Sequence, residues 1–292
     1  METNAFVIYD NKLFKADAPV LNISNRAFRF GDALFETIKV IDSEPLFVDL
    51  HIERISNAMQ LLGMLAIPDL TVDNLVAQIK ILLKRNNCEK SARVRFTIFR
   101  KDGGFYTPIT NQVSYTIEAY PLSVSDYEWN AKGLQIGFYK ENLKPINNFS
   151  KIKSANALLY VLASQYAQAN KFDDVFLLNT NHAIIESSNS NLFYFLNGRL
   201  YTPPLADGCL SGIMRFIVLA LAIENEIEIE ERSLYIDDIP FVKEAFLTNT
   251  LRGIVWISGI NDARYFNHTA RQFYELLLQK LNQLSNKNRF LV

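Results

Sequence analysis

In the segment RVRFTIF, residues Arg93 to Ile98 alternate strictly between polar and apolar side chains. Because successive side chains of a strand point to opposite faces, this period of two places Val94, Phe96 and Ile98 on the same face. The segment therefore predicts a strand with one buried face. A glycine-containing turn and a second alternating run at 113–120 follow it, which predicts a returning strand and an antiparallel sheet.

The rest of the first half predicts a hairpin at residues 6–14 and two helices. Asp49 is expected to cap the first helix, which should stop near Gly63, and Thr71 is expected to cap the second. An antiparallel sheet with two helices is an α+β design.

A polar, turn-rich stretch at 121–133 is interpreted as a linker between an N-terminal α+β domain, 1–120, and a C-terminal domain, 134–292. The second domain predicts short strands separated by Asn, Gly and Asp turns. It also predicts helices from about Ser154 to Asn170 and from Gly212 to about Glu224.

The composition indicates a small-molecule ligand. The 292 residues include 30 basic and 31 acidic ones, without the basic excess of a nucleic-acid binder. No apolar run is long enough to cross a bilayer, and the first residues lack the pattern of a signal peptide, so a cytoplasmic protein without a membrane partner is expected. Cys88 and Cys209 form no paired pattern, and the three histidines share no ligand spacing, so neither a disulfide nor a metal site is expected.

Lys153 lies in Phe149–Asn156, at the predicted start of an apolar helix. A desolvated lysine near another cation loses proton affinity, which suits a Schiff-base nucleophile. A lysine at a helix start is more often a solvated surface residue, so this signal alone is weak.

Glu186 is a single carboxylate between two apolar segments and is followed by five small polar residues. Neighbouring hydroxyls and amides are expected to hold a buried acid ionised against a cation such as a pyridinium. A Ser- and Asn-rich surface loop is the plainer alternative.

The run Leu210–Arg215 opens a helix, with Ser211 as the expected cap and Gly212 allowing close approach to the backbone. Such a helix start suits an anion such as phosphate, although most are ordinary capped helices. Arg54 lies between core-facing positions and is expected to need an anion partner. Thr250 closes a strand in Thr-Asn-Thr, a common end of a phosphate cradle.

In this order, these residues resemble the fold-type IV pyridoxal-phosphate enzymes, the family of branched-chain and D-amino-acid aminotransferases and aminodeoxychorismate lyase. The similar stretches fall between about Asn25 and Ile260 and include FGDALFET, HIERI, KIKSANAL, IIESSNSNLF, RLYTPPLADGCLSGIMR and FLTNT. The resemblance implies a two-domain α+β fold like that of D-amino-acid aminotransferase, with a larger C-terminal domain that has a β-barrel-like core. It also implies pyridoxal 5′-phosphate as cofactor and a homodimer.

By the same resemblance, Lys153 rather than Lys151 matches the Schiff-base lysine, because Ile-Lys-Ser-x-Asn aligns on it. The implied cofactor contacts are Lys153, Glu186 at the pyridine nitrogen, Arg54, Gly212, Ile213, Met214, Asn249 and Thr250. Two positions depart from the family pattern, since Met214 stands where many aminotransferases have Thr and Asn249 where Gly is frequent.

The candidate substrate residues are Phe35, Arg95, Arg100 and Tyr106, and none matches a known carboxylate trap. The favoured function is transamination of an amino acid, branched-chain or related, with a 2-oxo acid acceptor. Aminodeoxychorismate lyase, which forms 4-aminobenzoate and pyruvate, is the first alternative. A non-catalytic pyridoxal-phosphate binder is the second.

Overall fold

The computed structural model describes residues 6–124, 126–261 and 263–289. Its contacts divide the chain into two units. The first consists of Met1–Asp126 and Ile152–Ala157, and the second of Tyr127–Lys151 and Leu158–Val292. The division falls inside the predicted linker 121–133, of which residue 125 lies outside the described residues. The sequence interpretation had assigned all of 134–292 to the second domain, whereas residues 152–157 group with the first unit.

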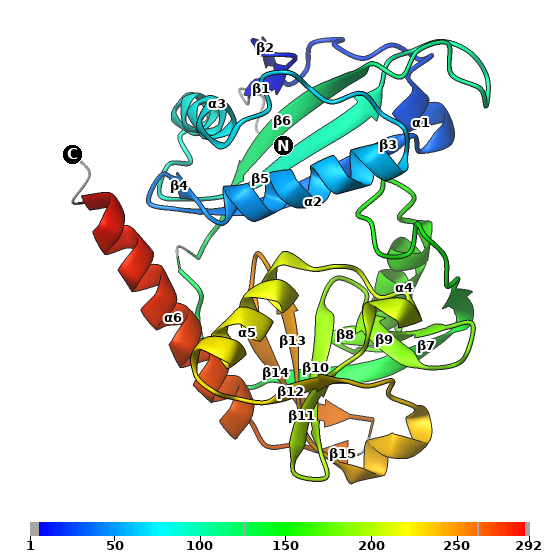
Figure 1. Ribbon diagram of the computed structural model, residues 1–292, viewed down its shortest axis with the longest axis vertical. Coiled ribbons are helices and arrows are strands. Elements are labelled where there is room, and N and C mark those ends of the chain that lie inside the picture. Colours follow the sequence, from blue (N-terminus) through cyan, green and yellow to red (C-terminus); the bar gives the residue numbers. More distant parts are fainter. Residues whose placement is uncertain (1–5, 125, 262, 290–292) are drawn as a thin grey trace. The chain divides into compact units, whose positions relative to one another are not determined.

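The first unit is built on a six-stranded sheet in the order β2-β1-β6-β5-β3-β4 (Figure 1). All its neighbouring pairs are antiparallel. The strands are β1 (Phe6–Tyr9), β2 (Lys12–Lys15), β3 (Ala33–Ile41), β4 (Glu44–Pro45), β5 (Ser91–Arg100) and β6 (Val113–Pro121). The predicted hairpin and the predicted returning strand are therefore confirmed.

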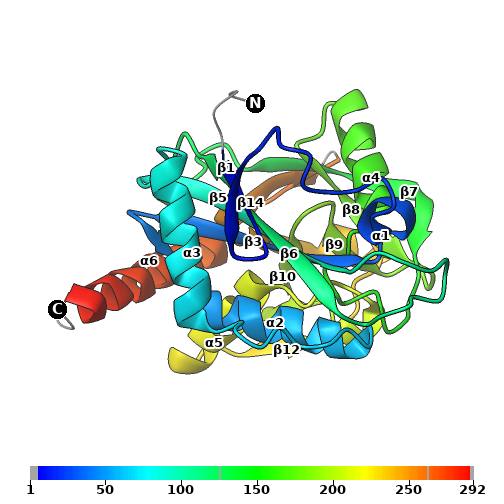
Figure 2. The ribbon, with the colours of Figure 1, turned by 90° about the horizontal axis from the view of Figure 1, so that it is seen from above.

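Helices α2 (Val48–Leu61) and α3 (Val72–Arg85) pack on one face of this sheet, while α1 (Arg26–Phe30) precedes β3 (Figures 1 and 2). The core side chains of β5 include Val94, Phe96 and Ile98, each at most 1% exposed. Strict alternation thus identified the buried face, because a shift of one residue would turn these side chains to the other side.

The helix ends confirm two predictions and correct one. Thr71 caps α3 by accepting a hydrogen bond from the Asn74 amide, and Gly63 (φ +64°) follows the end of α2 as predicted. Asp49 does not cap α2, which has Phe47 in a left-handed conformation at its N-cap position and no side-chain cap. Asp49 lies in the first helical turn, where its negative charge interacts favourably with the positive end of the helix dipole.

The second unit is built on a closed sheet. The order β10-β13-β14-β7-β8-β9 returns to β10 through the β9–β10 pairing, which gives a six-stranded barrel. Its strands are β7 (Leu134–Lys144), β8 (Asp174–Asn179), β9 (Ile184–Ser187), β10 (Asn191–Leu196), β13 (Val242–Asn249) and β14 (Gly253–Ile260). The expected barrel-like core is confirmed.

Further elements surround this barrel. The outer strands are β11 (Arg199–Thr202), β12 (Ile229–Glu231) and β15 (Ala263–Arg264), and two short 3₁₀ helices span Leu205–Asp207 and Ile236–Phe241. The helices are α4 (Leu158–Ala169), α5 (Ile213–Glu224) and α6 (His268–Arg289). In Figure 1, α5 and α6 lie beside β13, and α4 lies beside β8.

The predicted helix start at Ser154 was wrong, because α4 begins only at Leu158. Residues 152–157 are irregular instead, and Ser154 forms an isolated bridge with Leu34 at the start of β3. The Phe35 amide donates to the Lys153 carbonyl and the Ala155 amide to the Ala33 carbonyl, both at 2.9 Å. These bonds place Lys153 beside β3 rather than at a helix N-terminus.

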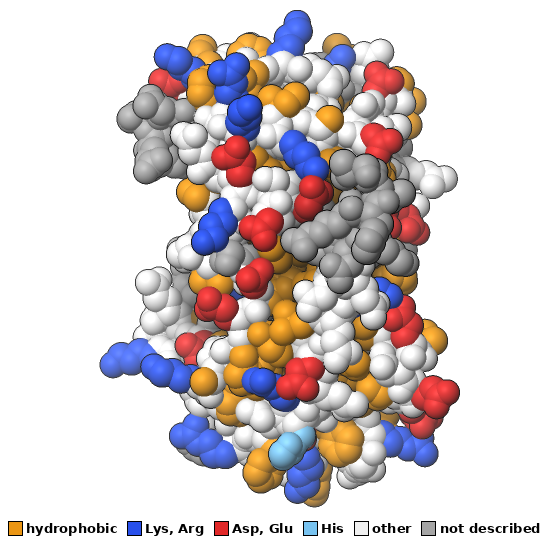
Figure 3. All heavy atoms as spheres, turned by 90° about the vertical axis from the view of Figure 1, so that its left-hand side faces the viewer, with side chains coloured by type: hydrophobic (Ala, Val, Ile, Leu, Met, Phe, Trp, Pro, Cys, Tyr) orange, Lys and Arg blue, Asp and Glu red, His pale blue; other side chains and the backbone are white. Residues whose placement is uncertain are grey.

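Acidic and basic side chains are interspersed on the face shown in Figure 3, in keeping with the formal net charge of −1. Across the described residues, no helix combines the length and the apolar character needed to span a membrane.

Candidate active site

Glu186, near the end of β9, is the centre of a buried ionic network in the second unit. Only 3% of this residue is exposed. Its Oε1 accepts hydrogen bonds from the Lys144 ammonium group at 2.6 Å and the Tyr160 hydroxyl at 3.0 Å. Its Oε2 accepts one from the Leu210 amide at 2.8 Å. The carboxylate is therefore held rigidly by donors from three separate segments.

Sequence reasoning missed Lys144 and Tyr160. Lys144 ends β7 after a register shift, and Tyr160 lies in the first turn of α4, so no local pattern marks either residue. Burial, together with the negative charge of Glu186, raises the pKa of the Tyr160 hydroxyl. Tyr160 is thus a neutral donor to Glu186 at physiological pH.

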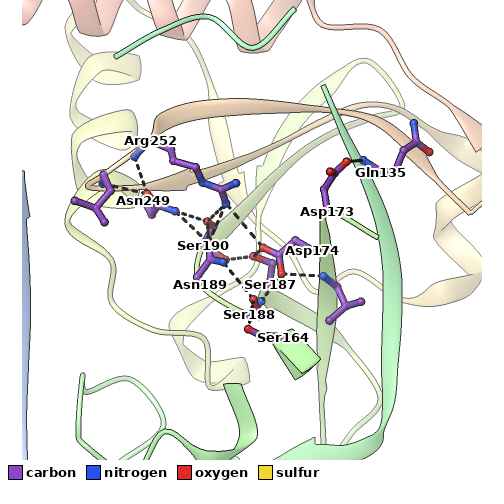
Figure 4. A network of polar contacts seen from close by, with 12 residues as sticks. Gln135, Ser164, Asp173, Asp174, Ser187, Ser188, Asn189, Ser190, Asn249 and Arg252 are labelled. Atoms are coloured by element: carbon purple, nitrogen blue, oxygen red, sulfur yellow. Dashed lines mark hydrogen bonds and ion pairs between the residues drawn. The ribbon is translucent and has the colours of Figure 1, made fainter. Parts of the chain in front are cut away.

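The polar loop Ser187–Asn191 was expected to supply the groups that hold Glu186, and the structure assigns most of them elsewhere (Figure 4). Ser187 Oγ and the Ser188 amide donate to the buried carboxylate of Asp174. Asn189 and Ser190 accept from Arg252 and from the Asn249 side chain. The loop therefore fixes its own shape through a separate acid.

The start of α5 lacks a side-chain cap. Gly212 is the N-cap residue, so the prediction that Ser211 caps the helix was wrong. A Cβ on Gly212 would lie 1.9 Å from Oδ1 of Asn191, so no larger residue fits there without a rearrangement. Because the first amides of a helix have no intrahelical acceptor, Ile213 and Met214 present N–H groups suited to an anion.

The turn between β13 and β14 contains the other two predicted contacts. The Asn249 side chain donates to Asn189 and Ser190 and accepts from the amides of residues 251 and 252, so its hydrogen-bonding capacity is used within the loop. The Thr250 carbonyl accepts from the Tyr127 hydroxyl. Thr248, paired with Asn191 across the sheet, has a buried Oγ1 without a hydrogen-bond partner among the described residues.

Arg54 in the first unit has the anion partner that its position predicted. Its Nε donates to Glu36 Oε1 at 2.8 Å and its Nη2 to Glu36 Oε2. His51 Nδ1 lies 2.6 Å from the same carboxylate. Burial alone would raise the pKa of Glu36, but Arg54 and His51 outweigh it and lower this pKa to about 2. Glu36 thereby fixes the direction in which the guanidinium group of Arg54 points.

Lys153 is half-buried, with its Nζ 4.5 Å from the centre of the Phe35 ring, whereas Lys151 is exposed. The guanidinium group of Arg95 lies 3.9 Å from the same ring centre. Phe35 therefore contacts two cations, one of which is the predicted Schiff-base lysine. Burial and the nearby Arg93 lower the pKa of Arg95, and Glu118 partly offsets them.

The face of the first sheet that carries Phe35 is cationic. The pairings of Lys39 with Arg93, and of Thr37 with Arg95, place these side chains on this face. Nε of Arg93 is buried and has no hydrogen-bond partner in the described part of the chain. The basic side chains on this face favour an anionic ligand, and Glu118 opposes them only at Arg95.

The remaining substrate candidates differ from Arg95. Arg100 is buried and donates to Asp32, to Asn111 and to backbone carbonyls at Leu62 and Gly63, which accounts for its burial by structural contacts. Tyr106 is 89% exposed on the loop between β5 and β6.

No metal-ligating group of three or more side chains occurs within residues 6–124, 126–261 and 263–289.

The fold and these residues agree with the comparisons with known proteins. The model of the amino-transferase class IV family matches residues 33–260, so the chain belongs to this family. The predicted family, fold class and enzyme class are thereby confirmed.

Individual relatives are similar over most of their length. D-alanine aminotransferase of Bacillus licheniformis is 24% identical, covering 87% of this chain and 88% of the relative. Aminodeoxychorismate lyase of Vibrio harveyi is 26% identical, with 82% and 87% covered. The structure of Escherichia coli branched-chain amino acid aminotransferase is 21% identical and covers 93% of both chains with a TM-score of 0.82, which supports the fold.

Class IV aminotransferases use pyridoxal 5′-phosphate, and the residues of this chain fit that group. Glu186 is a buried acceptor of the kind that a protonated ring nitrogen requires. The uncapped start of α5 and the tight approach at Gly212 suit a phosphate.

Proposed function

We propose that this chain is an aminotransferase that moves an amino group from an amino acid, branched-chain or related, to a 2-oxo acid. The observation that carries the proposal is the buried Glu186 carboxylate, held by three donors in a barrel whose neighbouring helix start is open to an anion. That combination suits a cofactor with a basic ring nitrogen and a phosphate.

Each site residue has a proposed role in this reaction. When bound, pyridoxal phosphate supplies an electron sink for the bond broken at the substrate α-carbon. Lys153 binds the cofactor through Nζ, and once released this Nζ moves the α-proton. Glu186 holds a proton at the ring nitrogen. Arg54, the Thr250 region and the amides of Gly212, Ile213 and Met214 bind the phosphate.

The cationic face with Lys39, Arg93 and Arg95 is proposed to bind substrate carboxylate, since it holds more basic than acidic groups. Of the candidates named from the sequence, Arg95 is retained in this role, and Phe35 is retained as the substrate-site ring that Arg95 and Lys153 contact. The contacts of Arg100 and the exposure of Tyr106 favour other functions for those two residues.

We further propose a homodimer in the cytoplasm. Both cysteines are free and buried, which suits a reducing compartment. Size-exclusion chromatography with light scattering measures the mass directly, and a monomer at micromolar concentration would contradict the dimer.

Aminodeoxychorismate lyase is the second candidate function. Met214 in Gly-Ile-Met-Arg is more like the lyase form of the helix start, and the Vibrio harveyi lyase is among the relatives. A non-catalytic cofactor binder is disfavoured by the retained Lys153, because a binder needs no base.

One experiment separates the two activities. The protein loaded with pyridoxal phosphate is mixed with a panel of L- and D-amino acids while the visible absorption is followed for conversion to the pyridoxamine form. Aminodeoxychorismate is tested in parallel for pyruvate release. Conversion by an amino acid supports transamination, whereas rapid pyruvate release without conversion by any amino acid would replace it with the lyase.

A further inference from the structure

Glu186 shares its carboxylate with a second buried ion, the ammonium group of Lys144. The side chains are 3% and 7% exposed, and their charged atoms lie 2.6 Å apart. Removing a charged group from water is costly unless an opposite charge and hydrogen bonds replace the water. Each ion therefore accounts for the burial of the other. Lys144 lies on β7 and Glu186 on β9, so these two strands fix the geometry of the pair.

We propose that Lys144 is a positioning residue that directs the Oε2 atom of Glu186 toward the ring nitrogen of pyridoxal phosphate. This inference rests on the proposed function. A carboxylate oxygen has about two acceptor directions, and on Oε1 they are taken by Lys144 and Tyr160. On Oε2, the described residues supply one donor, the Leu210 amide. Oε2 thus keeps one direction for a further N–H donor.

Lys144 also sets the charge of this site. Its ammonium group and a protonated ring nitrogen are both cations that use the same carboxylate. Lys144 therefore weakens the hold of Glu186 on the ring proton, and its removal should strengthen that hold. Lys144 and the ring nitrogen would both interact with Glu186. Lys144 would therefore change the pKa of the ring nitrogen without contacting the reacting atoms.

Two other titratable groups at this site, Tyr160 and Cys209, stay neutral in the pH range where the effect is measured. Tyr160, from α4, has its pKa raised by burial and by Glu186. Burial raises the pKa of the Cys209 thiol to about 12, with Glu186 adding to the shift and Arg215 and Lys144 opposing it. Arg215 is paired with Glu231. A titration of the cofactor absorption between about pH 5 and 9 is therefore not complicated by Tyr160 or Cys209.

The test compares Lys144→Met, Lys144→Arg and the control Lys140→Met in the full chain loaded with pyridoxal phosphate. Lys140 lies on the same strand and is exposed, so its loss removes an equal charge outside the network. The readout is the pH midpoint of the visible absorption of the bound cofactor. The midpoint should move to higher pH by about one unit or more in Lys144→Met, because loss of a cation favours bound protons. Lys144→Arg should stay near the wild type, and Lys140→Met should match it.

A second readout uses the unloaded protein. Without Lys144, Glu186 is a buried carboxylate without its ion partner, so Lys144→Met should lose stability toward urea as the pH rises from about 5 to 9. Adding Glu186→Gln should remove this pH dependence. If Lys144→Met does not fold, Lys144→Gln, which keeps a donor without charge, replaces it in both measurements.

The outcomes distinguish a failure of the proposed role of Lys144 from a failure of the proposed function. An unchanged absorption midpoint in a folded, loaded Lys144→Met variant would reduce Lys144 to a structural role and overturn the inference while leaving the proposed function intact. A wild type that binds no pyridoxal phosphate would overturn the proposed function itself, and the role of Lys144 with it.

Discussion

Replacing Glu36 by glutamine removes the buried charge that Arg54 and His51 both face. Glu36 is 1% exposed, and it accepts two bonds from Arg54 and one contact from His51. An amide keeps the shape of the side chain but loses the charge and one acceptor. The substitution therefore tests whether the carboxylate, rather than its packing, stabilises the first unit and holds Arg54.

The size of the effect follows from the pKa of Glu36, which falls from 4.5 to about 2 in the folded protein. At about 1.36 kcal/mol per pH unit, this difference corresponds to about 3 kcal/mol of stability. Because the folded pKa is depressed, the contribution is fully present above about pH 4.5 and is lost as the pH falls toward about 2. The variant should thus be about 3 kcal/mol less stable at pH 7, and the difference should shrink below pH 4.5.

Urea unfolding of the unloaded protein at pH 7, 4 and 3, followed by far-UV circular dichroism, measures this difference. Both tryptophans, Trp129 and Trp256, belong to the second unit, so their fluorescence follows the unfolding of that unit. Glu44→Gln is the matched variant, because Glu44 forms an exposed ion pair with Lys80 and its loss should cost less than about 1 kcal/mol. A Glu36→Gln deficit that stays constant from pH 7 to pH 3 would refute the electrostatic explanation.

Three further substitutions test the proposed cofactor contacts. Glu186→Gln should leave the cofactor bound but slow turnover strongly, since an amide cannot hold the ring proton as well; near-wild-type kcat with full cofactor content would exclude Glu186 as the ring partner. Arg54→Ala should weaken pyridoxal-phosphate affinity by about 1.5–3 kcal/mol through the loss of a charge-assisted bond, measured by equilibrium titration, and an unchanged Kd would remove Arg54 from the phosphate site. Gly212→Ala should lower cofactor affinity and thermal stability together, because its Cβ would meet Asn191 Oδ1 at 1.9 Å, and a variant with unaltered Kd and Tm would show that the approach is not constrained.

Regular patterns predicted much of the fold from the sequence. The period of two in Arg93–Phe99 identified both the strand and its buried face, and the Thr71 cap follows from the local chemistry of one side chain. The start of α4 at Leu158 could not be predicted from local sequence patterns. Residues 153–155 form backbone hydrogen bonds with the start of β3 instead of a helical turn, and that long-range pairing leaves no local signal.

In the candidate site, too, local sequence predicted some contacts, while contacts between distant segments were missed. The need of Arg54 for an anion followed from its place among core positions, and Glu36 meets it. Lys144 and Tyr160 were missed because they reach Glu186 from distant segments and resemble ordinary strand-end and helix residues in the sequence. The Ser- and Asn-rich loop was given too large a role, since two of its donors bind Asp174 and the Asn191 side chain donates to the Leu210 carbonyl.

The attachment point of the cofactor tests the central claim most directly. The protein loaded with pyridoxal phosphate is reduced with borohydride, digested and mapped by mass spectrometry. The account predicts a single modified lysine, Lys153, which is half-buried against Phe35. Modification of exposed Lys151 or of buried Lys144, or the absence of any modified lysine, would contradict it.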